Sequence, residues 1–420
     1  MNTARAETLA ARAQLLEQGG WEFRRLEAFR FMPPPAAAVW LGDEPCGSCD
    51  ASPLAGAGWT LHPVGAAGLV DARWLDAGDP AQRGALFHGL PQPGEDAVAP
   101  FAWAHRALCR QGLRLRVAAA ADREAPPLIL QLRHLPRDSV DAPLLVVELE
   151  AGARCVIVET HERDAASGCE RDLVQNLQIH LRLAKGARLQ HWRQAEPAAG
   201  DRIAHHLDLR LAAGSHYAQA MLARGSAYHL QRAHVQFDGE GATAQLGSVL
   251  LSDAQQLDQQ VRMVHAAPRS TGTARTLALA RGKALVAADL YAHVRPGAED
   301  ADIHQHLSGI PTAGSPRLVM RPQLEIEHDA VQAAHGTTWG RLPDESIFFA
   351  RQRGLDEATA LSLILRGMAA AELARGLGDD ALCETVGATQ ALEAALARLL
   401  GASDAPATAA AALAKEGSRG

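Results

Sequence analysis

The chain has 420 residues, of which 47% are hydrophobic and 21% are charged, a balance typical of a globular protein rather than a disordered one. Its formal net charge is −7 and its basic residues are scattered, which argues against a dedicated nucleic-acid-binding protein. No apolar run reaches the roughly 18 residues of a membrane helix, so we expect neither a nucleic-acid partner nor a membrane partner.

The N-terminal segment is predicted to form an amphipathic helix over residues 3–18, closed by Gly19-Gly20. It carries Glu7 and Glu17 and lacks an apolar block before a small-residue cleavage site, so we expect no secretory signal. Six cysteines in a chain of this length do not form a secreted disulfide framework. The expected location is therefore the reducing cytoplasm.

One CxxC pattern, Cys46-Gly47-Ser48-Cys49, follows this helix. A redox pair would need a βαβ context, and a zinc site would need a second pair of ligands at matching distance. Neither pattern is visible, so incidental loop thiols are favoured and the role of Cys46 and Cys49 stays open.

Residues 76–98 are rich in Gly, Pro, Asp and Gln, which predicts an exposed connector. A short helix is predicted over residues 101–111, with Gly112 as its C-terminal stop. We therefore assign residues 1–111 to a helical N-terminal region with a connector.

After Gly112 the period of the hydrophobic residues changes from 3.6 to 2, which predicts strands with one buried face. Several of these segments end in a glycine-containing turn. The turn glycines stand at positions 152, 186, 214, 241 and 282, at steps of 34, 28, 27 and 41 residues. Steps of about 20–50 residues are typical of stacked repeats such as β-helices.

Other β folds fit this region less well. No helical segment is predicted between residues 113 and 339, which excludes a doubly wound α/β fold, and tight hairpin signals that a sandwich needs are missing. A narrow core of Leu, Val and Ala also agrees with an aromatic content of only 4%. The sequence therefore predicts a mainly β protein with a parallel β-helix core over residues 112–342.

The helical period returns at Asp344, with predicted helices over residues 344–354, from Asp356 onward and over residues 380–400. We assign residues 343–420 to a helical C-terminal region whose Ala-rich end is expected to fray. The apolar faces within residues 347–366 have two readings: they cover the open end of the β-helix, or they dock a partner.

The sequence lacks the common catalytic signatures. It contains no phosphate-binding Gly-x4-Gly-Lys-Ser/Thr loop, no Gly-x-Ser-x-Gly, no His-Glu-x-x-His and no Gly-x-Gly-x-x-Gly motif. We therefore expect no nucleotide hydrolysis through a phosphate-binding loop of this chain.

The segment 321–355 carries the most specific pattern. It contains, in order, Pro322-Gln323-Leu324-Glu325-Ile326, Asp329-Ala330-Val331, Ala334-His335-Gly336-Thr337-Thr338 and Phe348-Phe349-Ala350-Arg351-Gln352-Arg353-Gly354-Leu355. This resembles the signature of the SufB/SufD family of iron–sulfur assembly scaffolds, which has Pro-x-Leu-Glu-Ile, an Asp-Val pair, Ser-His-Gly-Ala-Thr and Phe-Tyr-Leu-x-x-Arg-Gly. Upstream, Asp258, residues 264–268 and residues 27–31 are similar to further elements of the family.

The resemblance implies a right-handed parallel β-helix flanked by helical regions, and a non-catalytic scaffold role in an ATP-driven assembly complex. The implied partners are a SufB-like β-helix subunit and a SufC-like ABC ATPase. The implied cargo is a transient iron–sulfur cluster shared with the SufB-like subunit, and a reduced flavin in the complex is left open.

The resemblance also implies site residues. Contact with the ATPase is expected at Phe348, Arg353, Gly354 and Leu355, and the edge facing the SufB-like subunit at Asp302, Gln305 and Glu325. A polar cluster near this edge has a second reading as a metal site, because His and Asp at i and i+2 share one face of a strand. An ordinary solvated face is the alternative for this cluster, which consists of Asp302, His304, Gln305 and His306 with His328 and Asp329.

His335 is the candidate ligand for iron or the cluster. By spacing alone a lone histidine is more often structural, but the surrounding motif favours a functional role, since an imidazole can ligate iron or relay protons. Gly336 after it is typical of SufD, whereas SufB has Glu there and a cysteine ahead of the histidine. Ala333 and Ala334 precede His335 here, so no thiol is available at this spot.

Two other functions stay open from the sequence. One is a stand-alone protein that binds or delivers iron through its 18 histidines. The other is a carbohydrate-active β-helix enzyme that uses paired carboxylates, although such enzymes are often exported.

Overall fold

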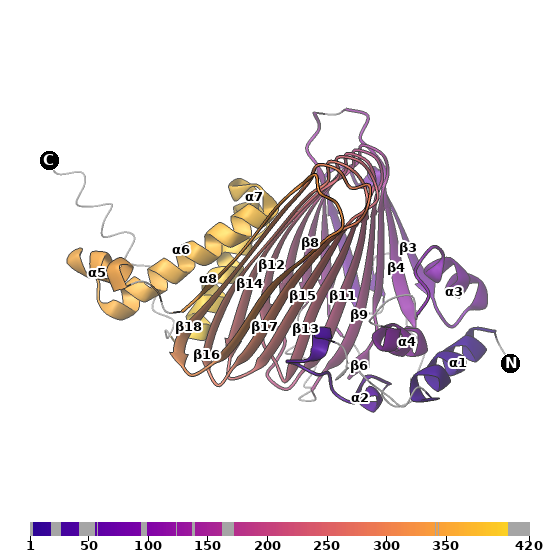
Figure 1. Ribbon diagram of the computed structural model, residues 1–420. Coiled ribbons are helices and arrows are strands. Elements are labelled where there is room, and N and C mark those ends of the chain that lie inside the picture. Colours follow the sequence, from indigo (N-terminus) through magenta and orange to yellow (C-terminus); the bar gives the residue numbers. More distant parts are fainter. Residues whose placement is uncertain are drawn as a thin grey trace.

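The computed structural model describes residues 3–17, 27–41, 55–56, 58–93, 99–122, 124–136, 139–161, 172–340, 342 and 344–401. Two long sheets form a parallel β-helix of about eight turns, with helices at both termini of the chain (Figure 1). This confirms the predicted fold class. No helix among these residues is long and apolar enough to cross a bilayer. Cys46, Cys49 and the C-terminal end expected to fray lie outside the described residues.

Successive strands of the β-helix alternate between the two sheets. Sheet A has the order β1 (Ala55–Gly56), β2 (Trp59–Val64), β5 (Leu128–His134), β8 (Arg154–His161), β10 (Arg188–Ala195), β12 (His216–Arg224), β14 (Thr243–Asp253), β16 (Thr271–Gly282), β18 (Ala301–Gly314), β20 (Val331–Trp339). Sheet B has the order β3 (Val70–Asp76), β4 (Gln111–Val117), β7 (Leu144–Leu149), β9 (Val174–Leu183), β11 (Arg202–Leu211), β13 (Tyr228–Phe237), β15 (Gln256–His265), β17 (Leu285–Val294), β19 (Arg317–Ile326), with β6 (Val140–Asp141) beside β9.

The predicted glycine turns lie where one coil passes into the next. All five turn glycines have positive φ, between 61° and 74°, a conformation that costs glycine little because it has no Cβ. The turns also stack: the Gly186 amide donates to the Ala213 carbonyl at 3.0 Å, and the Gly214 amide donates to the Glu240 carbonyl at 2.9 Å. Four of the glycines lie between a strand of sheet B and the next strand of sheet A, whereas Gly282 lies at the opposite turn, between β16 of sheet A and β17 of sheet B. The last step is therefore longer because it joins two different kinds of turn.

Inward side chains of both sheets form one continuous aliphatic core, but part of the interior is polar. Glu159 is fully buried there and accepts hydrogen bonds from His161 Nε2 at 2.7 Å, His191 Nε2 at 2.9 Å and Arg193 Nη2 at 3.1 Å. Arg193 also reaches Gln231 of the opposite sheet at 3.4 Å. A charged side chain in this interior is therefore paired on several sides at once.

The C-terminal helices are α5 (Asp344–Gln352), α6 (Glu357–Leu377), α7 (Asp380–Thr385) and α8 (Ala388–Leu400). Asp356 caps α6 as predicted, by accepting from the Thr359 amide at 2.9 Å. The single helix predicted over residues 380–400 is wrong, because the chain breaks at Gly387 with a φ of 76°. Helices α6 and α8 pack on the outer face of sheet A instead of closing the end of the β-helix (Figure 1).

The N-terminal region holds α1 (Thr3–Glu17), η2 (Glu27–Phe29), α2 (Ala37–Leu41), η3 (Ala67–Leu69), α3 (Pro80–Phe87) and α4 (Ala99–Leu108), together with β1 to β3. Helix α3 contradicts the predicted connector: Asp79 caps it through the amides of Ala81 and Gln82. Gly112 is not a helix stop but part of β4, where an added Cβ would lie 2.5 Å from a methyl carbon of Leu86. The division into residues 1–111, 112–342 and 343–420 stays a prediction.

Candidate functional site

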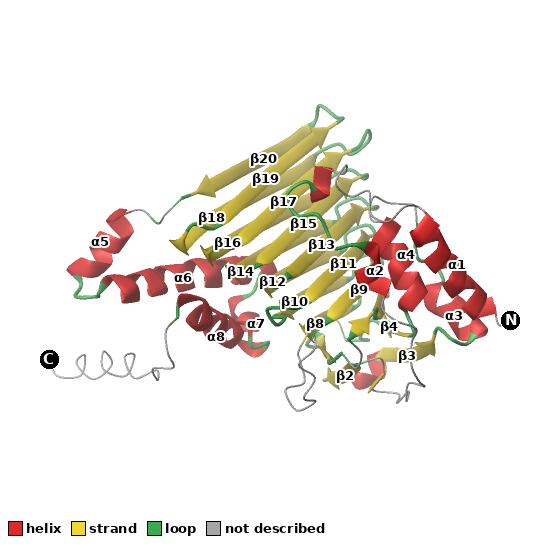
Figure 2. Ribbon diagram, turned by 90° about the horizontal axis from the view of Figure 1, so that it is seen from below, coloured by secondary structure: helices red, strands yellow, loops and turns green. Residues whose placement is uncertain are grey.

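The two ends of the β-helix differ in how their last strands are covered. At the N-terminal end, the antiparallel strands β1 and β2 complete sheet A, and the antiparallel strand β3 completes sheet B. At the C-terminal end, β19 and β20 are the last strands of their sheets, and in the described part of the chain each has a strand on one side only (Figure 2). These edges are 10 and 9 residues long. Each one presents backbone N–H and C=O groups that can pair with another chain.

His335 lies in the middle of β20 at this open end. Its neighbour in β18 is Gln305, and Ala333 two residues earlier neighbours the core residue Ile303. Because every second residue of a strand shares one face, the His335 side chain is directed to the interior side of the last coil. It is nevertheless exposed, since no further coil covers it. The imidazole is thus accessible from the end of the β-helix, beside a position that carries no thiol.

Of the three residues predicted at the edge, only Gln305 lies beside His335. Gln305 is 4% exposed, and its Nε2 donates to the Gln323 carbonyl of sheet B at 3.2 Å. Asp302 lies on the outer face of sheet A, where its Oδ1 is 2.9 Å from His304 Nε2. Glu325 lies on the outer face of sheet B and accepts a hydrogen bond from the Tyr291 hydroxyl. A partner-binding role for all three residues stays a prediction.

One group of side chains in the described ranges has the spacing of a metal site. Ligand atoms of His293, Glu325 and Glu327 lie within 4.8 Å of one another, with His293 Nε2 at 2.5 Å from Glu327 Oε1. An imidazole with two carboxylates suits a divalent transition metal ion. The predicted cluster around His304 and His328 is not brought together in this way within the same ranges. Sequence reasoning missed the group because His293 lies in β17, whereas Glu325 lies in β19 and Glu327 directly after it.

A second contact that the sequence did not reveal joins the N-terminal segment to the open end. Arg321 of β19 donates through Nη1 to Glu27 at 2.6 Å, and through Nη2 to Asp289. Its guanidinium carbon also lies 5.0 Å from the ring centroid of Phe31. Two motifs that are almost 300 residues apart therefore pack together on the outer face of sheet B.

Asp258 lies beneath this contact and is 2% exposed. Its carboxylate accepts from Gln260 Nε2 at 2.9 Å, and Gln260 Nε2 also donates to the Ala28 carbonyl at 2.8 Å. Burial raises the pKa of Asp258 to about 7; the nearby Asp289 adds to the rise, and the hydrogen bond from Gln260 opposes it.

We expect Asp258→Asn to flatten the pH dependence of stability. The folded-state pKa of Asp258 lies above the ordinary aspartate value of about 4, so the stability that this group contributes is full below about pH 4 and is lost as pH rises through about 7. Urea unfolding across this range measures the effect. The matched control is Asp71→Asn, at an exposed carboxylate paired with Arg73. Identical pH profiles for wild type and Asp258→Asn would contradict the assignment.

The helix that follows β20 exposes an aromatic pair. Phe348 and Phe349 of α5 are 56% and 59% exposed, and their ring centroids lie 6.1 Å apart. Helix α5 packs against α6 and projects beyond the sheets (Figure 2). Arg353 donates to the Phe349 carbonyl at 3.2 Å, and Gly354 has a φ of 84°, which turns the chain into α6. Exposed aromatic residues close together are typical of a docking surface.

Comparison with known proteins agrees with these features. The SufBD core domain of the SUF system for FeS cluster assembly matches residues 134–368, which include β18 to β20 and His335. The chain is 26% identical over 264 residues to the iron-sulfur cluster assembly protein SufD of Escherichia coli (strain K12), covering 58% of this chain and 62% of that protein. It is 30% identical over 145 residues to an iron-sulfur cluster assembly SufBD family protein of Mycobacterium leprae (strain TN), covering 32% and 37% of the two chains.

These alignments span less than two thirds of the length of either relative. The domain match, in contrast, covers more than half of this chain and most of the β-helix. The chain therefore belongs to the SufBD family of iron–sulfur cluster assembly proteins.

Proposed function

We propose that this chain is a SufD-like, non-catalytic scaffold subunit for iron–sulfur cluster assembly. It pairs through the open end of its β-helix with a SufB-like subunit and carries a SufC-like ATPase on its C-terminal helices. The observation that carries the proposal is the open end itself, where β19 and β20 have a strand on one side only in the described ranges and His335 of β20 is accessible.

Pairing with a second β-helix satisfies both edges together. Strands β19 and β20 belong to different sheets, so a partner that ends in two similar strands would continue both sheets at once. Such pairing also covers the interior side of the last coil. His335 would then lie between the two subunits, where its neutral imidazole can hold iron of the cargo cluster while the partner supplies thiolates.

The ATPase is proposed to dock on α5 and the turn after it, at Phe348, Arg353, Gly354 and Leu355. Helix α6 would transmit its movement, because Glu372 of α6 is bound to Arg275 of sheet A by two contacts of 3.0 Å. When bound nucleotide favours the state in which two ATPases touch, the resulting displacement of α5 is passed through α6 to sheet A, because α6 is bound to that sheet. The proposal also includes a reduced flavin in the complex and a cytoplasmic location, and both of these rest only on the family resemblance.

A second candidate function is a stand-alone protein that binds or delivers iron. It is favoured by one observation, the group of His293, Glu325 and Glu327 on the outer face of sheet B. Iron titration of the isolated chain separates the two candidates, since a pure scaffold takes up iron only in the complex. A carbohydrate-active enzyme finds no support in the family match.

The test is co-expression with a SufB-like subunit and a SufC-like ATPase, followed by size-exclusion analysis and measurement of cluster formation. His335→Ala is expected to leave the complex assembled and to lower the cluster yield by about tenfold or more, because a ligand is lost. The matched control is His304→Ala, at an exposed histidine on the outer face of the neighbouring strand.

Two results would contradict the proposal. A chain that stays alone when both partners are abundant refutes the pairing. Wild-type cluster formation by the His335→Ala complex refutes the role of the imidazole.

A further inference from the structure

The side chain of Gln305 in β18 carries a buried acceptor that has no partner. Its Nε2 donates to the Gln323 carbonyl of sheet B at 3.2 Å, which fixes the orientation of the amide because a carbonyl oxygen can only accept. The other end of the amide, Oε1, is buried and accepts no hydrogen bond from the described residues. Buried polar atoms in native proteins are almost always paired, so this oxygen points to a donor that is not yet engaged.

The strand register places an imidazole directly beside this oxygen. Gln305 is the Cα partner of His335 in β20 on one side and of Ala274 in β16 on the other. Ala274 belongs to the aliphatic core and its side chain has no donor, whereas a neutral imidazole carries one N–H. The exposed His335 side chain makes no hydrogen bond to another described residue, so its ring can turn towards Gln305 without breaking a contact.

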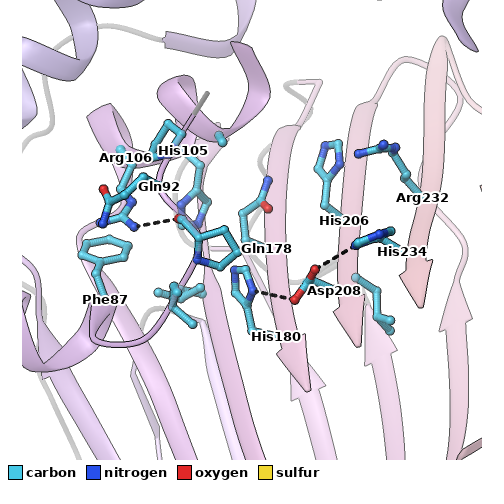
Figure 3. A pocket seen from close by; sticks show the side chains of 16 residues that line it. Phe87, Gln92, His105, Arg106, Gln178, His180, His206, Asp208, Arg232 and His234 are labelled. Carbon is cyan, nitrogen blue, oxygen red and sulfur yellow. Dashed lines mark hydrogen bonds and ion pairs between the residues drawn. The ribbon is translucent and has the colours of Figure 1, made fainter. Parts of the chain in front are cut away.

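Other coils of this β-helix already contain pairs of this kind. Gln231 of β13 and His205 of β11 are Cα partners in the interior, and Gln231 Nε2 lies 3.1 Å from His205 Nδ1. On the outer face of sheet B, His234 donates through Nδ1 to its Cα partner Asp208 at 3.1 Å (Figure 3). The spacing of adjacent strands therefore suits a hydrogen bond between an imidazole and a side chain at the same level of the next coil.

We propose that Gln305 is a positioning residue for His335. Its Oε1 accepts the N–H of one ring nitrogen, which holds the imidazole in one tautomer and directs the lone pair of the other nitrogen to the open end. Metal-bound histidines in proteins almost always donate their second ring N–H to an acceptor in this way. The inference rests on the proposed role of His335 in holding iron of the cargo cluster, and it gives Gln305 a task within this chain.

Thr337 is a competing donor on the same face of β20. It is the Cα partner of Leu307, so it lies two residues further along the strand than the position opposite Gln305. Direct neighbours on adjacent strands are about 4.8 Å apart, and two residues along a strand add a rise of about 6.6 Å. The direct neighbour His335 is therefore favoured as the donor to Gln305 Oε1.

The test is nitrogen-15 NMR of the histidine rings in the full chain without its partners, at about pH 8.5, where an ordinary imidazole is neutral. The chemical shifts of the two ring nitrogens give the ratio of the two tautomers. His62 is exposed on β2 and serves as an internal reference. We expect the ratio of His335 to differ from that of His62 by about fivefold, the factor that a typical net hydrogen bond supplies.

Two variants of Gln305 separate the acceptor from the rest of the side chain. Gln305→Met removes the acceptor and should bring the tautomer ratio of His335 to that of His62. Gln305→Glu keeps an oxygen acceptor at the same place and should retain the wild-type ratio. The matched control is Gln332→Met, at an exposed glutamine on the opposite face of β20, which should also retain it. Circular dichroism verifies that each variant is folded.

A wild-type His335 ratio equal to that of His62 overturns the proposal, and this measurement needs no variant. An unchanged ratio in folded Gln305→Met also overturns it, as expected if Thr337 were the donor. Cluster formation tests the proposed function separately. If Gln305→Met shifts the tautomer ratio while the His335→Ala complex forms clusters as wild type does, the positioning of the ring is upheld and its role as an iron ligand is refuted.

Discussion

Replacing Glu159 with glutamine is expected to lower the free energy of unfolding by about 3–5 kcal/mol, the cost of leaving a buried charge without its partner. Glu159 is fully buried in the β-helix, and the Arg193 side chain beside it is 5% exposed. Glutamine keeps the size of the side chain but removes the negative charge. Water cannot solvate the guanidinium at this depth, so the loss is not recovered.

Acid should remove the same stabilisation. Burial alone would raise the pKa of Glu159, but Arg193 and the hydrogen bonds from His161 and His191 outweigh it and hold the pKa well below its usual range. The folded-state pKa is thus depressed, so the contribution is present at neutral pH and is lost only as pH falls through the folded-state value.

Urea unfolding followed by circular dichroism measures both effects. The matched control is Glu150→Gln, because Glu150 forms an exposed ion pair with Arg116 at 2.7 Å. An exposed pair contributes about 0–1 kcal/mol, so this variant should unfold nearly as wild type does. Equal decreases in the free energy of unfolding for Glu159→Gln and Glu150→Gln would contradict the prediction, because they would show that burial of the Glu159 ion pair adds nothing to stability.

Gly376→Ala is expected to destabilise the docking of α6 by about 1–3 kcal/mol, the usual cost of overfilling a packed contact. An added Cβ at Gly376 would lie 2.4 Å from the Gln219 carbonyl oxygen and 2.9 Å from the Gly247 Cα. Both obstacles are backbone atoms of sheet A, so the helix itself must shift. If α6 transmits ATPase movement, this variant should also weaken coupling to the sheets.

The same helix offers an opposite control. Gly367 is exposed, and apart from its chain neighbours and the backbone of its own helix no atom of the described residues lies within 4 Å of a Cβ added there. Gly367→Ala should therefore stabilise the protein by roughly 0.5–1 kcal/mol, because alanine loses less conformational entropy in a helix. Thermal unfolding of the two variants should give shifts of opposite sign. Shifts of the same sign would refute the close approach of α6 to sheet A.

Local pattern predicted the elements whose cause is local. Alternating residues such as Leu177 and Ile179 predicted strands, the spaced glycines predicted the coil turns, and Asp356 predicted the start of α6. Errors arose where two local signals compete. Asp79-Pro80 is both a turn pattern and a helix start, and Gly112 is both a helix stop and a residue that permits close packing.

The sequence by itself determined the period of the strands, the stacked-repeat architecture and the motif around His335, because each depends on residues close together in the chain. Only the tertiary structure decided that His335 lies at an open end beside Gln305 and that Arg321 meets Glu27. These neighbours are set by the register between coils and by helices docked on the sheets. That register results from packing summed over the whole core, which no local pattern encodes.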